Sequence, residues 1–219
     1  MARPLFTDEE LARISAAVAE AERATAGEIV PYVVARSGRY EVALWRGAGL
    51  GALLGAIVAL AVGALNDGWG LEWLYAAEGV LMVTLTGALA GAALAIVPAV
   101  RRMLAGKVRL DTHTARRAAQ AFVEEEVFNT RDRTGILLFV SLLEHRILVL
   151  GDAGINQKVA PEEWAEVVVL VRDGIKRRAL GEGLAAAVTR CGELLHRRGV
   201  GIRDDDTDEL PDAVRVRLD

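Results

Sequence analysis

Three acidic residues lie at the borders of apolar, β-rich stretches: Glu28 and Asp132 each precede one, and Asp152 follows another. Carboxylates that come close together repel one another and therefore favour a hard cation between them. Further oxygen donors lie nearby in the sequence, namely Asn129, Thr134, Asn156 and loop carbonyls. Because these donors are oxygens and no His or Cys cluster accompanies them, the set favours Ca²⁺ or Mg²⁺ over zinc.

The elements that must position these carboxylates are three predicted strands. Residues 29–34 are rich in β-formers, although Pro31 cannot donate to a ladder and indicates an edge, a bulge or a strand start. Residues 135–141 and 146–151 are near-continuous apolar runs separated by a short turn, which predicts a buried hairpin. A helix predicted over 112–128 would return the chain so that the second strand runs parallel to the first.

These directions place the beginnings of the first two strands and the end of the third at one edge of the sheet. The sequence therefore predicts a metal site formed by Glu28, Asp132 and Asp152. The alternative is that the three acids are ordinary loop and cap residues, which are common at strand ends.

Helices are predicted on either side of the strands in the sequence. Thr7 and Glu10 form a capping-box pattern before an amphipathic helix, and two further apolar periodicities follow the strand pair. Cys191 belongs to the last of these and is interpreted as a core residue. The element order predicts a layered α/β domain whose sheet is covered by helices.

Two charge-free apolar stretches, 47–65 and 79–100, interrupt this domain after its first strand. Each is long enough to cross a bilayer as a helix. A buried core helix is the alternative, but a soluble domain of this size rarely hides two such runs. The predicted organisation is a first part of the soluble domain (1–40), a transmembrane hairpin (41–103), the remainder of the domain (104–200) and a charged, mobile tail (201–219).

The flanks of the hairpin predict its orientation. Arginines precede the first run and basic residues follow the second, whereas the connecting loop is acidic and aromatic (Arg36, Arg39, Arg46; Arg101, Arg102, Lys107, Arg109; Asp67, Glu72, Glu78, Trp69, Trp73, Tyr75). The positive-inside rule then places both termini and the soluble domain in the cytoplasm, at the cell inner (plasma) membrane. Neither run contains a charge, so the hairpin is interpreted as an anchor and not as a transporter.

Glycines recur every four residues in both runs, at Gly47, Gly51 and Gly55 and at Gly87 and Gly91. Such stripes predict close helix packing, either within one chain or between chains in a homo-oligomer. The plainer alternative is that Gly is simply common in membrane helices. The formal net charge of −4 excludes the basic face expected of a nucleic-acid-binding protein.

Three blocks of the soluble sequence, 25–30, 131–141 and 147–155, resemble the TPM domain family, which is named from thylakoid lumen, Psb32 and MOLO-1 proteins. The resemblance covers about residues 5–200 and implies an α/β/α sandwich. It also implies calcium binding, since some members bind it, with Glu28, Asp132 and Asp152 at the matching positions. Two departures are visible: Asp152 stands where many members have an aromatic residue between glycines, and the hairpin interrupts the domain instead of following it.

The resemblance implies two functions. The first is a membrane-anchored, divalent-cation-binding accessory or assembly module whose partners are the lipid bilayer and other membrane proteins. The alternative is a metal-dependent acid phosphatase, in which the cation would activate a water. Arg131 and Arg133 are the basic residues nearest to a phosphate clamp, and no catalytic residue is assigned.

Overall fold

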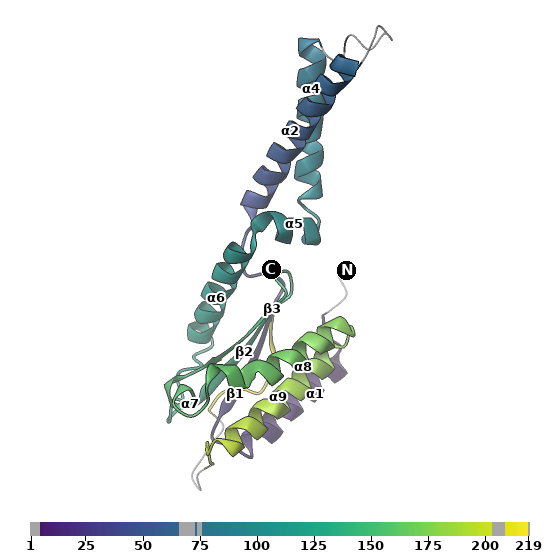
Figure 1. Cartoon of the computed structure of the whole chain (residues 1–219). Helices are drawn as coiled ribbons and strands as arrows, with labels where there is room; N and C mark the ends of the chain where they lie inside the picture. Colours follow the sequence, from purple (N-terminus) through teal and green to yellow (C-terminus); the bar gives the residue numbers. More distant parts are fainter. Residues whose placement is uncertain (1–4, 66–72, 74–75, 203–208, 219) are drawn as a thin grey trace. The chain divides into compact units, whose positions relative to one another are not determined.

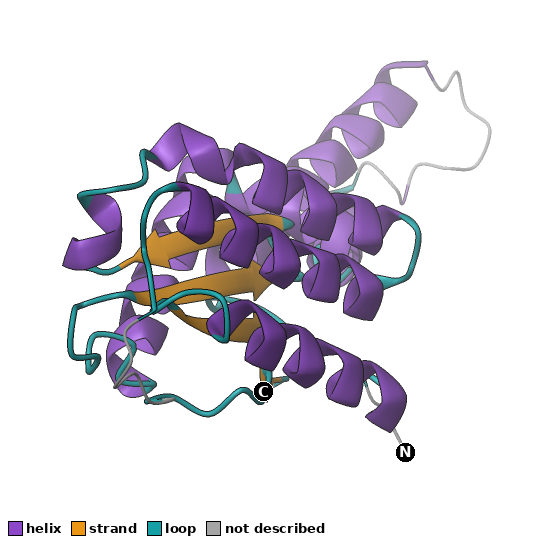
Figure 2. Ribbon diagram, turned by 90° about the horizontal axis from the view of Figure 1, so that it is seen from below, coloured by secondary structure: helices purple, strands orange, loops and turns teal. Residues whose placement is uncertain are grey.

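The computed structural model describes residues 5–65, 73, 76–202 and 209–218. It divides into two compact units. We call Met1–Ser37 together with His113–Asp219 the α/β unit, and Gly38–Thr112 the hairpin unit. Helices and strands of both units are drawn in Figures 1 and 2.

A mixed sheet of four strands forms the centre of the α/β unit. Its strands are β1 (Glu28–Val34), β2 (Gly135–Ser141), β3 (Arg146–Gly151) and β4 (Arg215–Arg217), in the order β3-β2-β1-β4. β1 is parallel to β2 and β4, and β2 is antiparallel to β3. The predicted directions of the first three strands are therefore confirmed.

One face of the sheet packs against α1 (Asp8–Glu22), α8 (Ala165–Lys176) and α9 (Leu180–Arg197), with the short helices α7 (Ala153–Asn156) and η1 (Pro161–Trp164) between β3 and α8. The predicted capping box begins α1: the Thr7 N–H donates to the Glu10 carboxylate (2.8 Å), and the Glu10 N–H donates to Thr7 Oγ1 (3.2 Å). Cys191 on α9 is fully buried in this core, and burial raises its pKa to about 12. Its interpretation as a core residue is confirmed.

The other face carries Val30, Tyr32, Leu137 and Phe139, which pack in one cluster with buried alanines of α6 (Lys107–Glu124). Successive strand residues point to opposite faces, so the near-continuous apolar runs supply both cores. Helix α6 begins five residues before the predicted start at 112 and ends four before the predicted end at 128. The chain leaves the helix through Glu126, whose φ of 51° is left-handed.

The C-terminal segment differs from the prediction of a mobile tail. Arg215–Arg217 forms β4, and Val214 and Val216 pack against the first core. Arg215 also pairs with Glu125 at 3.1 Å. β4 pairs with β1 from Tyr32 onward. The pairing begins after Pro31, because proline has no N–H group to donate to a neighbouring strand.

The hairpin unit contains α2 (Glu41–Leu65), α4 (Ala77–Leu94) and α5 (Pro98–Ala105). Both α2 and α4 are long and apolar enough to cross a membrane, and only 11% and 6% of their most apolar windows are buried. The predicted second span, 79–100, is wrong at its end: α4 stops at Leu94 and Pro98 begins α5, because proline is tolerated at a first helical turn but not inside a helix. The loop residues Asp67, Trp69, Glu72 and Tyr75 lie outside the described residues.

The glycine stripes of α2 and α4 face each other within one chain. A Cβ at Gly51 would lie 2.0 Å from the Gly87 carbonyl oxygen, and one at Gly91 would lie 2.0 Å from that of Gly47. Gly49, also on α2, would meet no atom within 4 Å. The stripes are therefore used for intramolecular packing of the hairpin.

Gly51→Val should separate the two helices, because a side chain cannot fit against the Gly87 backbone and such overpacking costs about 1–3 kcal/mol. Gly49→Val introduces the same β-branched residue into open space and is the matched control. The measurement is the distance between spin labels at Leu60→Cys and Leu81→Cys in detergent, by pulsed electron paramagnetic resonance. A longer distance in Gly51→Val alone is expected; equal distances in both variants would contradict the packing.

Candidate carboxylate site at one edge of the sheet

The three predicted carboxylates, of Glu28, Asp132 and Asp152, lie at one end of the strands, where β1 and β2 begin and β3 ends, as the strand directions predicted. We call this end of the sheet the carboxylate edge. Glu28 is paired with Gly135 at the start of β2, and Ile136 is paired with Gly151 at the end of β3. The strand order, however, places β2 between β1 and β3. Two strand spacings therefore separate the backbones at Glu28 and Asp152 by about 10 Å.

Glu28 is 7% exposed and binds the C-terminal segment. Its carboxylate accepts the N–H groups of Glu209 (3.1 Å) and Leu210 (3.2 Å). The Glu209 carboxylate in turn accepts the N–H of Arg131, at 3.0 and 3.1 Å. These contacts brace the segment before β4 against the starts of β1 and β2. Sequence reasoning missed Glu209, because no local pattern links it to Glu28.

Asp152 is 6% exposed and begins α7. Its Oδ1 accepts hydrogen bonds from the Ala153 N–H (2.7 Å) and from Arg133 Nη2 (3.1 Å), while Arg133 Nε lies 2.7 Å from Oδ2. Its own N–H donates to the Gly135 carbonyl (2.9 Å) and so extends the ladder. Asp152 thus acts as a helix cap that also holds the loop before β2.

The loop before β2 is shaped by close backbone contact with the turn after β3. The Gly154 N–H donates to the Arg133 carbonyl (2.9 Å), and a Cβ at Gly154 would lie 2.3 Å from the Asp132 carbonyl oxygen. Arg133 takes a left-handed φ of 59° here. The sequence motif around Gly154 is therefore explained by backbone packing.

The Asp132 carboxylate, by contrast, belongs to an exposed residue. Within the described ranges, no three His, Cys, Asp or Glu side chains are grouped closely enough to hold a metal ion. Of the predicted supporting donors, the Asn156 amide donates to the Gly151 carbonyl (2.6 Å). The structure brings the three acids to one edge but not into one ligand group, and the metal site stays a prediction.

A second polar cluster, which sequence reasoning missed, lies at the opposite edge, where β1 and β2 end. Glu144 accepts the Ser37 N–H (2.7 Å) and the Ser141 hydroxyl, and the Ser37 and Ser141 hydroxyl oxygens are 2.7 Å apart. A serine that donates to a carboxylate is the arrangement of an activated nucleophile. Ser141 is fully buried and Glu144 nearly so. The cluster therefore fixes the exit of β1 and the β2–β3 turn. Its only sequence signal is a serine that ends an apolar run.

A third polar group joins α6 to β1. Arg117 donates to the Tyr32 hydroxyl (2.6 Å) and to Glu124 (2.8 Å), and its guanidinium carbon lies 5.4 Å from the Tyr32 ring centroid. Burial raises the pKa of Tyr32, and the hydrogen bond from Arg117 lowers the pKa of Glu124. Tyr32 is therefore neutral at neutral pH and fully buried, so that a substrate cannot reach its hydroxyl. Its contacts with Arg117 connect β1 to α6.

No family model matches the chain, and no curated protein matches it. Among solved structures, the fold is similar to that of BA42 protein from the psychrophilic bacterium Bizionia argentinensis, with a TM-score of 0.59 and 18% sequence identity. The match covers 99% of this chain and 98% of that chain. At this identity the likeness shows the fold alone. That fold is TPM-domain-like, as the sequence resemblance implied, while membership of the family stays a prediction.

Glu28→Ala should detach the C-terminal segment and destabilise the α/β unit. Loss of the buried acceptor leaves the N–H groups of Glu209 and Leu210 without a hydrogen-bond partner, which should lower the free energy of unfolding by about 1–3 kcal/mol. Asp132→Ala removes an exposed carboxylate from the same edge and is the control. Urea unfolding of the full chain in detergent can be followed by alkylation of Cys191, the one thiol of the sequence. Equal midpoints for both variants would show that Glu28 does not brace this segment.

Proposed function

We propose that this protein is a membrane-anchored module, in which the hairpin unit tethers the α/β unit to the inner (plasma) membrane for an accessory or assembly role with other membrane proteins. One observation carries the proposal. Large apolar side chains along α2 and α4 are exposed, among them Leu50, Leu53, Leu54, Ile57, Leu60, Leu81, Met82, Leu85 and Leu89.

This exposure supports a lipid environment over a soluble one. A core helix of a soluble protein would be mostly buried, whereas these helices bury little of their surface in the chain. Contiguous apolar patches of this extent mark an interaction surface or a membrane. At 1.5 Å per residue, the 25 residues of α2 span about 37 Å and the 18 of α4 about 27 Å, close to the thickness of the hydrocarbon core.

The distribution of charge supports the proposed orientation. Basic residues gather where the hairpin unit rejoins the chain, at Arg101 and Arg102 on α5 and at Lys107 and Arg109 on α6, and Glu78 lies in the first turn of α4. The positive-inside rule assigns the basic end to the cytoplasm. The α/β unit and both termini would then be cytoplasmic.

The polar clusters of the α/β unit support a binding role over an enzymatic one. Arg133, the candidate phosphate ligand of a phosphatase, pairs with Asp152, and the Ser141–Glu144 pair is buried. Each of these arrangements has a structural use that needs no substrate. The phosphatase alternative therefore rests on the family resemblance alone.

An alkaline carbonate wash of membranes that contain the full chain tests the anchor. The chain should remain in the membrane pellet, since carbonate removes peripheral proteins but not helices in the hydrocarbon core. A variant without residues 41–103 is the control and should be released. Recovery of the full chain in the soluble fraction would refute the proposed anchor.

Phosphate release from an aryl phosphate separates the module from the enzyme. The purified full chain should release none above background, with or without Ca²⁺ or Mg²⁺. Turnover that Asp152→Asn abolishes and Asp173→Asn retains would instead support the phosphatase, because Asp173 is a half-exposed acid on helix α8 and belongs to none of the strand ends that carry the candidate site.

We also propose that a divalent cation binds at the carboxylate edge, through Asp132 and Asp152. The Arg133 side chain that pairs with Asp152 is 55% exposed, so a cation would compete with it for the Asp152 carboxylate at the solvent boundary. Millimolar Ca²⁺ or Mg²⁺ should then raise the melting temperature of the full chain in detergent. At a hundredfold excess of cation over Kd, the free energy of unfolding should increase by up to about 2.7 kcal/mol. Asp132→Asn should remove the rise. Absence of a rise, or a rise that Asp132→Asn retains, would exclude the cation site.

A further inference from the structure

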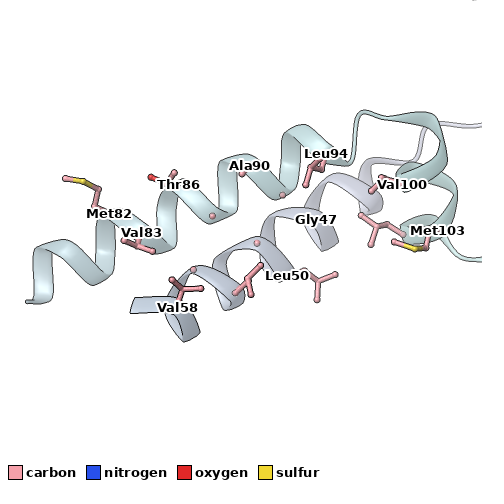
Figure 3. Close-up of a pocket in the computed structure, with 16 residues that line it drawn as sticks. Gly47, Leu50, Val58, Met82, Val83, Thr86, Ala90, Leu94, Val100 and Met103 are labelled. Carbon is pink, nitrogen blue, oxygen red and sulfur yellow. The ribbon is translucent and has the colours of Figure 1, made fainter. Parts of the chain in front are cut away.

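An open apolar groove of about 600 Å³ runs along the hairpin unit between α2, α4 and α5. Its walls include Leu50 and Leu54 of α2, Thr86 and Ala90 of α4, and Met103 and Leu104 of α5. Figure 3 shows Val58 and Met82 toward one end of this groove and Val100 and Met103 at the other. The volume lies within the range of small-molecule binding sites, about 300–1,000 Å³.

The groove exists because the glycine stripes line its floor. Gly47, Gly51, Gly87 and Gly91 bring the two backbones together and leave no side chains there, so that larger residues on either side form raised walls. Thr86 is the one polar side chain among the lining residues. An occupant of the groove must therefore be an elongated apolar group.

Helix α5 turns one end of this groove into a charged entrance. Its residues Val100, Met103 and Leu104 share one helical face that lines the groove. At the same end, Arg46 donates to the Leu104 carbonyl (2.6 Å) and Arg101 donates to the Ala95 carbonyl (3.4 Å). These bonds hold two guanidinium groups beside the apolar walls.

The described acidic residues of the hairpin unit are Glu41 in the first turn of α2, Glu78 in the first turn of α4 and Asp111 on α6. In the part of the chain that the structure describes, Arg46 and Arg101 donate to the backbone carbonyls named above and form no ion pair with these acids. Guanidinium groups in a partly apolar setting bind phosphate through paired, charge-assisted hydrogen bonds. An apolar groove with such an entrance is complementary to an acyl chain that ends in an anionic phosphate.

We propose that this groove binds one anionic phospholipid, with an acyl chain between α2 and α4 and its phosphate at Arg46 and Arg101. The site rests on the proposed membrane location and goes beyond it, because it distinguishes one bound lipid from the surrounding bilayer. Residues of α5 lie across the end of the groove in Figure 3. A flexible acyl chain tolerates this closure, whereas a straight transmembrane helix of a partner needs a groove that is open at both ends.

Native mass spectrometry of the full chain in detergent tests the site, with phosphatidylglycerol and phosphatidylcholine of identical acyl chains as probes. The chain should bind one phosphatidylglycerol at least tenfold more tightly than phosphatidylcholine. Arg46→Gln and Arg101→Gln should each reduce that preference severalfold, and Arg109→Gln on α6 is the charge control. Equal affinity for the two lipids would overturn the proposal.

A second pair of variants tests the groove itself. Ala90→Leu fills the groove, whereas Ala93→Leu adds the same atoms to an exposed position of α4 outside it. Ala90→Leu should lower the affinity for both lipids at least fivefold, and Ala93→Leu should leave it unchanged. Equal effects of the two variants, or a second copy of the chain in place of lipid, would overturn the proposal. A chain that resists carbonate but shows no lipid preference would refute the lipid site and leave the anchor intact.

Discussion

The hairpin unit depends on one constraint: the backbones of α2 and α4 touch where both helices carry glycine. Because that contact uses the small residues, many large apolar side chains of the two helices are left exposed, among them Leu53, Leu60, Leu85 and Leu89. An uncovered apolar surface of this length is stable in a bilayer and unstable in water. The proposed membrane anchor and the proposed lipid site both rest on this distribution of small and large residues. Pro98 adds the remaining feature, because it ends the second span early and allows α5 to lie across the groove.

The α/β unit shows how far acidic residues at strand ends can be interpreted from sequence. The strands at 135–141 and 146–151 were predicted with the observed bounds, because uninterrupted apolar runs and a short turn leave few alternatives. Their directions correctly placed Glu28, Asp132 and Asp152 at one edge. The partners of these side chains could not be predicted in the same way. Glu28 binds backbone groups more than 180 residues away, and Arg133 is one of two arginines in the same turn.

The C-terminal strand and the lateral strand order account for the rest of the difference. A strand of three residues has too few alternating positions to stand out from a charged tail, so β4 had no periodic signal. The lateral order β3-β2-β1-β4 places β2 between β1 and β3, and β2 therefore separates the two buried carboxylates. The insertion of a hairpin after β1 is compatible with this sheet, because Glu144 and Ser141 fix the chain at Ser37, where it leaves the α/β unit. The likeness to BA42 protein supports this fold and carries no information on activity.

The most direct test of the account is the side of the membrane on which each unit lies. Cys191 is buried with a pKa of about 12 and gives little background, so single cysteines can be labelled with a membrane-impermeant maleimide in spheroplasts of a bacterial host. Glu78→Cys, in the first turn of α4, should react from outside, and Arg23→Cys, after α1, should react only once the membrane is permeabilised. Reaction of Arg23→Cys in intact spheroplasts, or protection of both cysteines, would contradict a hairpin that crosses the bilayer twice with its α/β unit in the cytoplasm.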